Sequence, residues 1–228
     1  FALTNTGEEI IKSSHGLLTT IAYQVEGEKP LYALEGSVPI AGAAVQWLRD
    51  NLNIIKQSED IESLAMTEKD NGGVYFVPAF SGLFSPYWDE TARGSLFGLT
   101  RFSNKSHIAR AVLESVAFQT YELLESMEKD LDIEFQNIKV DGGMVENNLL
   151  MQFQSDILNK PVMSQNINEI TSLGVGVASY LYFKKLPIEE LGNYFSTAKT
   201  WSPNMDNDSR IKTLSLWYKA IERSKHWL

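Results

Sequence analysis

The first 38 residues alternate apolar and polar positions in the short runs that are typical of β-strands. Residues 17–25 (LLTTIAYQV) place β-branched and aromatic side chains in loose alternation, and turn formers stand on both sides of them. Residues 1–7 and 31–38 have the same character. Three consecutive short strands with tight connections predict an antiparallel meander.

Apolar positions recur every three or four residues in the segments that follow. Residues 41–55 place their apolar side chains on one helical face, after the boundary that Pro39 sets. The longest periodic segment predicts a helix from a cap at Ser106 to Glu128. The same periodicity predicts three further helices. One begins after a cap at Asn147, and another covers 173–183 with Thr171 or Ser172 as its cap. The third covers 207–225, with Leu214, Trp217 and Ile221 facing inward.

Short apolar segments between these helices predict strands at 74–80, within 137–143 and at 161–164. The predicted order is three strands, helix, an irregular excursion, helix, strand, helix, strand, helix. An antiparallel unit followed by βα units predicts an α/β fold, with a mixed sheet and helices on both of its faces. No linker interrupts residues 1–228, so we expect one compact domain.

Composition and charge restrict the classes of function. Of the 228 residues, 43% are apolar and 21% are charged, which is typical of a globular protein, and the chain begins at Phe1 in a strand-like segment, as a fragment would. The formal net charge of -9 argues against a broad nucleic-acid surface, because phosphate neutralisation needs clustered Lys and Arg. An acidic protein can still bind a nucleotide through backbone N–H groups and helix N-termini.

Several kinds of site lack the residues they need. The sequence contains no cysteine, which excludes disulfides and cysteine metal sites and suits a cytoplasmic location, and its three histidines show no metal-ligand spacing. The longest mostly apolar stretch, residues 173–183, is too short for a membrane span, and the N-terminus does not resemble a signal peptide. Neither a G-x-S-x-G nor a P-loop sequence occurs.

The first candidate binding segment is Asp141–Asn147 (DGGMVEN), which lies between a predicted strand and a predicted helix. Its two glycines allow a sharp turn and leave no Cβ to block a planar ligand or a phosphate, and Asn147 stands at the helix start, where free N–H groups point outward. A nucleotide contact is therefore one interpretation. An ordinary strand-to-helix turn with an asparagine cap is the other.

The second candidate is Ala41–Gln46 (AGAAVQ), at the start of a predicted helix. Gly42 allows a flat group to approach closely, and Gln46 lies one turn later on the same face, within reach of such a group. A tight helix–helix contact beside a surface glutamine explains the same residues.

Three further features favour structural roles. Residues 85–89 (SPYWD) could form a sugar platform, but a rigid loop with an Asp89–Arg93 ion pair explains them better. The carboxylate of Glu114, on the long helix, is expected to have a structural role, and His107 near the helix start is expected to be exposed.

Several segments together identify a family resemblance. Residues Gly94–Glu114 (GSLFGLTRFSNKSHIARAVLE) resemble the second signature of the FGGY carbohydrate kinases. Other parts of the C-terminal half of that family resemble residues 5–23, 33–52, 77–94, 140–158 and 171–176. Within the family these segments are most similar to those of the glycerol kinases. The resemblance implies one half of a ribonuclease-H-like, actin- and hexokinase-type ATPase, with a mixed five-stranded sheet, and a C-terminal nucleotide-binding domain over 1–228.

The resemblance also implies site residues and ligands. It assigns nucleotide contacts to Gly42, Gln46, Gly143 and Asn147, and a glycerol contact to Phe1. The ligands implied are ATP or ADP, Mg²⁺ and glycerol, and the partner is the N-terminal half of the same enzyme. That half would supply the catalytic aspartate and most metal ligands, so no catalytic or metal-binding residue is expected in residues 1–228, and the chain by itself is expected to be inactive.

Three other functions stay open at this point. The chain could belong to a kinase of another sugar or polyol in the same family, or to a nucleotide-responsive interaction domain without catalysis. Residues Trp201–Arg210 are polar and could form a partner-binding or regulatory loop, which leaves a homodimer open.

Overall fold

A computed structural model describes residues 1–167 and 169–228 and divides the chain into two compact units. Unit 1 comprises Phe1–Glu134 and Met205–Leu228, and unit 2 comprises Phe135–Asn204. The assignment of all of residues 1–228 to one nucleotide-binding domain stays a prediction. The described strands form sheets of three, two and three strands, so the mixed five-stranded sheet also stays a prediction.

The N-terminal sheet of unit 1 contains the three predicted strands, but their order is not that of a meander. β3 (Leu31–Gly36) lies at the centre, antiparallel to both β1 (Ala2–Gly7) and β2 (Leu18–Tyr23). The connection over residues 8–17 allows β1 to reach the far side of β3, and residues 24–30 join β2 to β3. β3 takes the centre because it contributes the most buried side chains of the sheet.

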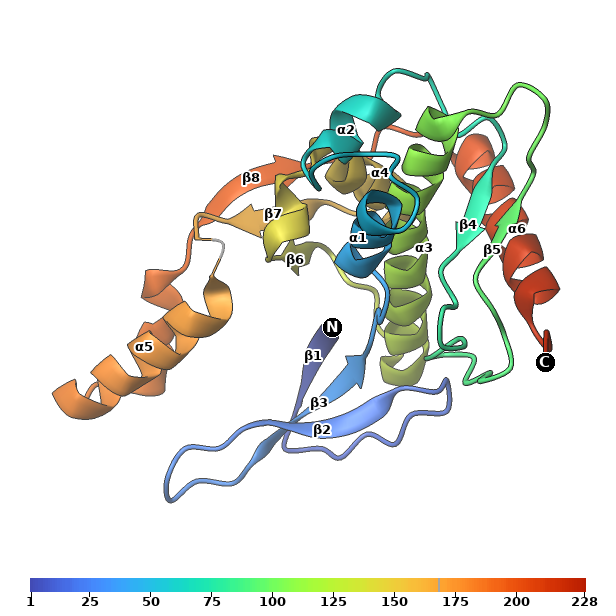
Figure 1. Ribbon diagram of the computed structural model, residues 1–228. Coiled ribbons are helices and arrows are strands. Elements are labelled where there is room, and N and C mark those ends of the chain that lie inside the picture. Colours follow the sequence, from blue (N-terminus) through green and yellow to red (C-terminus); the bar gives the residue numbers. More distant parts are fainter. Residues whose placement is uncertain (168) are drawn as a thin grey trace. The chain divides into compact units, whose positions relative to one another are not determined.

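The helix α3 (Lys105–Leu131) forms the scaffold of unit 1. It contacts α1 (Gly42–Asp50), α2 (Asp60–Ala65), β1 and β4 (Tyr75–Val77). Figure 1 shows α3 with α1 and α2 along one side and β4, β5 and α6 along the other. Buried side chains recur along the length of α3, as the apolar periodicity of its sequence predicted.

The cap of α3 is Asn104, not the predicted Ser106. The Asn104 side chain accepts hydrogen bonds from the backbone N–H groups of Ser106 (2.8 Å) and His107 (3.4 Å), and the His107 ring accepts one from the Asn104 N–H (3.2 Å). Ser106 is instead buried, and its hydroxyl accepts a hydrogen bond from Thr67 (2.8 Å). The prediction that His107 is exposed was also wrong, because this reciprocal cap leaves its side chain only 13% exposed.

The remaining elements of unit 1 pack through aromatic side chains. Trp47 of α1 stacks on Phe76 of β4 with ring centroids 5.6 Å apart, and Trp217 of α6 (Asn207–Ser224) stacks on Phe118 of α3 at 4.8 Å. The predicted inward face of α6 is confirmed, because Leu214, Trp217 and Ile221 are buried. The sequence did not predict β5 (Ser95–Phe97), which pairs antiparallel with β4, and α1 ends earlier than predicted.

Unit 2 is a small sheet with helices. β6 (Ile138–Val140) is parallel to β7 (Val162–Gln165), which is antiparallel to β8 (Thr197–Trp201). The helical elements are the 3₁₀ helix η1 (Gly143–Glu146), α4 (Asn148–Leu158), α5 (Ile170–Lys184) and the 3₁₀ helix η2 (Ile188–Tyr194).

Two features of unit 2 differ from the sequence prediction. α5 begins at Ile170 without a side-chain cap, so neither Thr171 nor Ser172 caps it. β8 was not predicted, because its side chains before Trp201 are exposed and show no apolar alternation, and only its pairing with β7 defines it as a strand.

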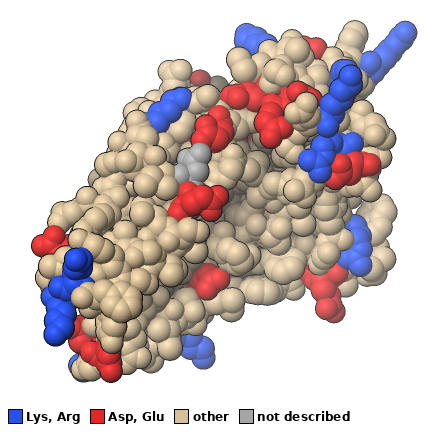
Figure 2. Space-filling view, turned by 60° about the vertical axis from the view of Figure 1, so that its left-hand side comes forward, with Lys and Arg blue, Asp and Glu red and all other residues tan. Residues whose placement is uncertain are grey.

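The charged side chains and the apolar character of the helices can be described for the residues that the structure covers. Figure 2 shows Lys and Arg in small separate groups, with Asp and Glu beside them, on the face that it presents. Over residues 1–167 and 169–228, no helix combines the length and the apolar character that a membrane span requires.

Candidate functional site

The start of α1 presents unsatisfied backbone N–H groups. Gly42 is the first helical residue, and Ala41 before it makes no side-chain capping hydrogen bond. The first turn contains no acidic residue, so no carboxylate of α1 occupies the positive end of the helix. Gln46 lies one turn later and is exposed. The structure therefore places the predicted pair Gly42 and Gln46 on one accessible helix, where an anion or a flat polar group can approach.

The second candidate segment has an open backbone. Gly142 has a φ of 91°, a conformation that favours glycine, and Gly143 begins η1. A Cβ built on either residue would meet nothing within 4 Å. This open space admits a ligand against the main chain, although an ordinary exposed turn has it as well.

Asn147 caps α4, as the sequence predicted. Its side-chain oxygen accepts a hydrogen bond from the Leu150 N–H at 2.8 Å. The capping interpretation is thus confirmed, and the side-chain NH₂ group remains as a donor for a ligand. Gly143 and Asn147 belong to unit 2, whereas Gly42 and Gln46 belong to unit 1.

Phe1 precedes β1, and 87% of its surface is exposed.

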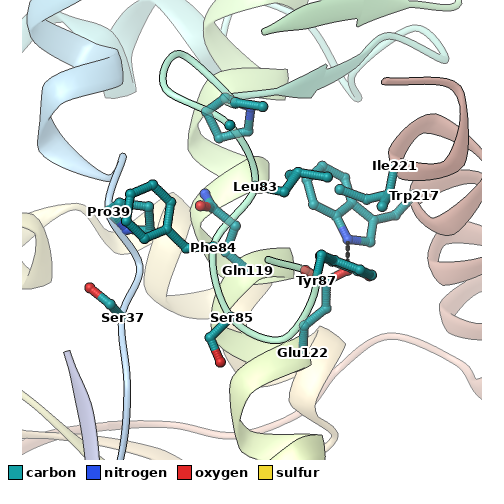
Figure 3. A pocket seen from close by; sticks show the side chains of 13 residues that line it. Ser37, Pro39, Leu83, Phe84, Ser85, Tyr87, Gln119, Glu122, Trp217 and Ile221 are labelled. Carbon is teal, nitrogen blue, oxygen red and sulfur yellow. Dashed lines mark hydrogen bonds between the residues drawn. The ribbon is translucent and has the colours of Figure 1, made fainter. Parts of the chain in front are cut away.

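A small cavity in unit 1 contains a buried carboxylate that sequence reasoning missed. Glu122 of α3 accepts hydrogen bonds from the Tyr87 hydroxyl (2.5 Å) and the Trp217 indole N–H (2.7 Å), as Figure 3 shows for the cavity that these residues line. Burial raises the pKa of Glu122 to about 7, against the lowering effect of the two hydrogen bonds. A glutamate on the apolar face of a predicted helix was the only signal, and its partners are distant in sequence.

The described residues contain no group of three or more His, Asp or Glu side chains that could hold a metal ion. Mg²⁺ in kinases usually takes one or two carboxylates together with the phosphates of its nucleotide, so its ligands are treated below only as part of the proposed function.

A family model matches residues 1–180, and it describes the C-terminal domain of the FGGY family of carbohydrate kinases. This chain belongs to the FGGY family. A curated relative named glycerol kinase, from Methylobacterium radiotolerans, is 53% identical over 230 residues, which cover 100% of this chain and 46% of the relative. The chain thus spans about half the length of the curated relatives it matches.

Solved structures of FGGY kinases share this fold. A crystal structure of Plasmodium falciparum glycerol kinase with ADP has a TM-score of 0.88 and 39% identity, over 97% of this chain and 44% of that one. Gluconate kinase from Lactobacillus acidophilus has a TM-score of 0.79 at 23% identity, also over 97% of this chain and 44% of that one. At that lower identity the likeness shows the fold alone.

The FGGY signature segment of this chain, Gly94–Glu114, forms β5 and the first part of α3. Glu114, at its end, is buried and accepts hydrogen bonds from Arg110 (3.1 Å) and Asn71 (2.7 Å). Burial raises the pKa of Glu114 to about 7, and Arg110 and Asn71 oppose that rise. The bond from Asn71 ties the turn before β4 to α3, and the Arg110 bond lies within α3, which agrees with the structural role that the sequence favoured.

Hydrogen bonds hold the loop at residues 85–93 of this FGGY domain, and the predicted Asp89–Arg93 ion pair is not among them. Asp89 accepts hydrogen bonds from Thr91 and from the His226 N–H, which lower its pKa to about 2, the Thr91 hydroxyl contributing most. The Arg93 guanidinium instead donates to the carbonyls of Glu90 and Ala92. A short aspartate side chain bonds more readily to the residues that follow it than to an arginine four positions away.

One cluster has the residue types of a nucleophilic relay without its geometry. His15 Nδ1 lies 2.7 Å from an Asp130 oxygen and 3.2 Å from the Ser14 hydroxyl. A relay needs the carboxylate on one ring nitrogen and the serine on the other, whereas here both face Nδ1. Asp130 also accepts hydrogen bonds from Ser13 and Ser14. The cluster thus anchors the β1–β2 loop to the end of α3.

Proposed function

We propose that this chain is the nucleotide-binding half of an ATP-dependent glycerol kinase, which transfers the γ-phosphoryl group of Mg-ATP to a glycerol hydroxyl and yields glycerol 3-phosphate. The observation that carries the proposal is the 53% identity, over the whole of this chain, to a relative named glycerol kinase. The likeness at 39% identity to a glycerol kinase solved with ADP supports the nucleotide as the ligand.

In this proposal each unit supplies one nucleotide-binding segment. The free N–H groups at the start of α1, with Gly42, receive negative charge, and the Gln46 amide hydrogen-bonds to the nucleotide. The open main chain at Gly143 admits the nucleotide closely, and the Asn147 NH₂ group donates to it while the Asn147 oxygen keeps its cap. The exposed ring of Phe1 packs on glycerol.

The remaining parts of the reaction lie outside residues 1–228 in this proposal. Phosphoryl transfer depends on positioning and on charge stabilisation from both sides of a cleft, and Mg²⁺ supplies neutralisation of the phosphate charge when it is bound. The aspartate that accepts the glycerol proton belongs to the N-terminal half. Closure of the two halves would exclude water and limit ATP hydrolysis.

The finer structural assignments belong to the same proposal. We infer the ribonuclease-H-like ATPase architecture and its five-stranded mixed sheet for the assembled protein, and a cytoplasmic location suits both an ATP-dependent reaction and a chain without cysteine. The rival within the family, a kinase for another sugar or polyol, has less support, because the gluconate and xylulose kinases are 23% identical or less.

Steady-state kinetics on the full-length protein that contains this chain test the proposal. With a coupled assay for ADP, kcat/KM for glycerol should exceed that for xylulose, gluconate and ribulose by at least about a hundredfold, because the site would be built for the hydrogen bonds of the triol. Similar values for all four compounds would reject glycerol as the substrate. Nucleotide binding without any phosphorylation would favour the non-catalytic alternative.

A further inference from the structure

The segment that connects β3 to α1 leads directly into the proposed nucleotide contact at Gly42, and a cavity lies along one side of it. Residues 37–41 pass along the cavity of Figure 3, whose lining includes Ser37 and Pro39 from this segment and Gln119 and Glu122 from α3. A gap beside a backbone segment removes the close contacts that would otherwise hold it in place. Packing against α3 holds the body of α1, and a hydrogen bond to the preceding segment adds to that packing in defining the direction in which the helix begins.

Gln119 supplies a hydrogen bond at this point. Its side-chain nitrogen donates to the Ile40 carbonyl at 3.2 Å and to the Ser115 carbonyl of its own helix at 3.1 Å. The second bond holds the amide against α3, so the first ties the Ile40–Ala41 peptide to the scaffold helix. Figure 3 shows Gln119 projecting from α3 into the cavity, towards the segment that contains Pro39.

This peptide immediately precedes the first turn of α1. The Ala41 carbonyl accepts from the Ala44 N–H at 3.0 Å, and Ala41 provides no side-chain cap. The orientation of the Ile40–Ala41 peptide therefore sets the direction of the free N–H groups around Gly42. Within the same cavity, Glu122 lies one turn after Gln119 and fixes α3 to Tyr87 and Trp217, so the amide is anchored on a rigid base.

We propose that Gln119 is a positioning residue for nucleotide binding, which holds the Ile40–Ala41 peptide so that the start of α1 faces the ligand. The inference rests on the proposed function, because it assigns Gln119 a role only if Gly42 contacts a nucleotide. Gln119 itself does not touch the ligand, so its effect is on the affinity for ATP and not on the chemical step.

The test compares Gln119→Met with Thr120→Val in the full-length protein. Methionine has nearly the length of glutamine but cannot donate, and Thr120→Val removes a hydrogen bond to the Val116 carbonyl (2.8 Å) that stays within α3. Gln119→Met should raise the KM for ATP and the Kd for ADP about fivefold, the loss expected for one hydrogen bond, with KM for glycerol and kcat within about twofold. Thr120→Val should leave all four constants unchanged.

Thermal unfolding separates positioning from stability. Both variants should lower Tm, Gln119→Met somewhat more, since it loses the bonds to the Ile40 and Ser115 carbonyls whereas Thr120→Val loses one bond. If Gln119→Met does not fold, Gln119→Asn takes its place with the same expected rise, because its amide is one methylene too short. A KM for ATP equal to that of Thr120→Val, or equal rises in both KM values, would overturn the inference while the proposed function stands. An unmodified protein that neither binds ADP nor phosphorylates glycerol would overturn the proposed function itself.

Discussion

Gly143 offers the sharpest residue-scale test of the nucleotide site, because a side chain there should affect the ligand and not the fold. A Cβ at Gly143 would meet nothing within 4 Å, and the same holds for Gly192 in η2, another 3₁₀ helix of unit 2. Gly143→Val should raise the KM for ATP at least about tenfold by filling the space of the nucleotide, with the KM for glycerol nearly unchanged. Gly192→Val is the matched control.

Kinetics and thermal unfolding of both glycine variants check this expectation. Both should unfold at nearly the same temperature as the unmodified protein. A parallel rise in both KM values for Gly143→Val, or an equal change for Gly192→Val, would place the nucleotide elsewhere.

Glu122 should make the stability of unit 1 depend on pH. Its pKa in the folded chain is about 7, above the ordinary value of 4.5, so between these values the folded state holds a proton that the unfolded state has released. The free energy of unfolding should therefore fall as pH rises from about 4.5 to 7, and the buried Glu114 contributes in the same direction. Glu122→Gln should flatten this fall by about 2–3 kcal/mol, since the amide oxygen can still accept from Tyr87 and Trp217.

Urea unfolding at pH 5 and pH 8, followed by tryptophan fluorescence, measures this difference. Glu122→Leu is the contrasting variant, because it leaves two buried donors unsatisfied and should destabilise the fold at both pH values. A pH dependence for Glu122→Gln as steep as that of the unmodified chain would contradict the assignment.

At the scale of elements, two helix caps separate structural from functional roles. Asn147 caps α4 by accepting from Leu150 (2.8 Å), and Asp206 caps α6 by accepting from Ser209 (2.9 Å). Asn147→Ala and Asp206→Ala should each cost about 1 kcal/mol of stability. Only Asn147→Ala should also raise the KM for ATP, because only that cap is proposed to contact the nucleotide. Equal KM values for the two variants would reduce Asn147 to a cap alone.

Elements with strong local signals were predictable from the sequence. The long apolar period of α3 and the inward face of α6 required no tertiary information, and the asparagine before α4 is a cap by its local chemistry. The cap of α3 was misplaced, because Asn104 and Ser106 both qualify locally and only the reciprocal bond with His107 decides between them. β5 and β8 were missed because three to five residues carry too little periodicity, and pairing alone defines them.

At the scale of the whole molecule, the two units divide the proposed nucleotide contacts between them. Gly42 and Gln46 belong to unit 1, and Gly143 and Asn147 to unit 2. The chain covers 46% of the length of its curated relative, and the proposed function places the catalytic aspartate outside residues 1–228. This division is why the activity must be tested on the full-length protein.

The sequence by itself determined the α/β class, the main helices and the family, and it singled out the two glycine-containing segments, because each depends on local periodicity or on a run of adjacent residues. Only the tertiary structure decided the position of β3 between β1 and β2, and the bonds that join Glu122 to Tyr87 and Trp217 and Gln119 to Ile40. These contacts join residues 35 to 95 positions apart. Local sequence patterns do not show which distant residues will meet, because only the folding of the chain brings such pairs within hydrogen-bonding distance.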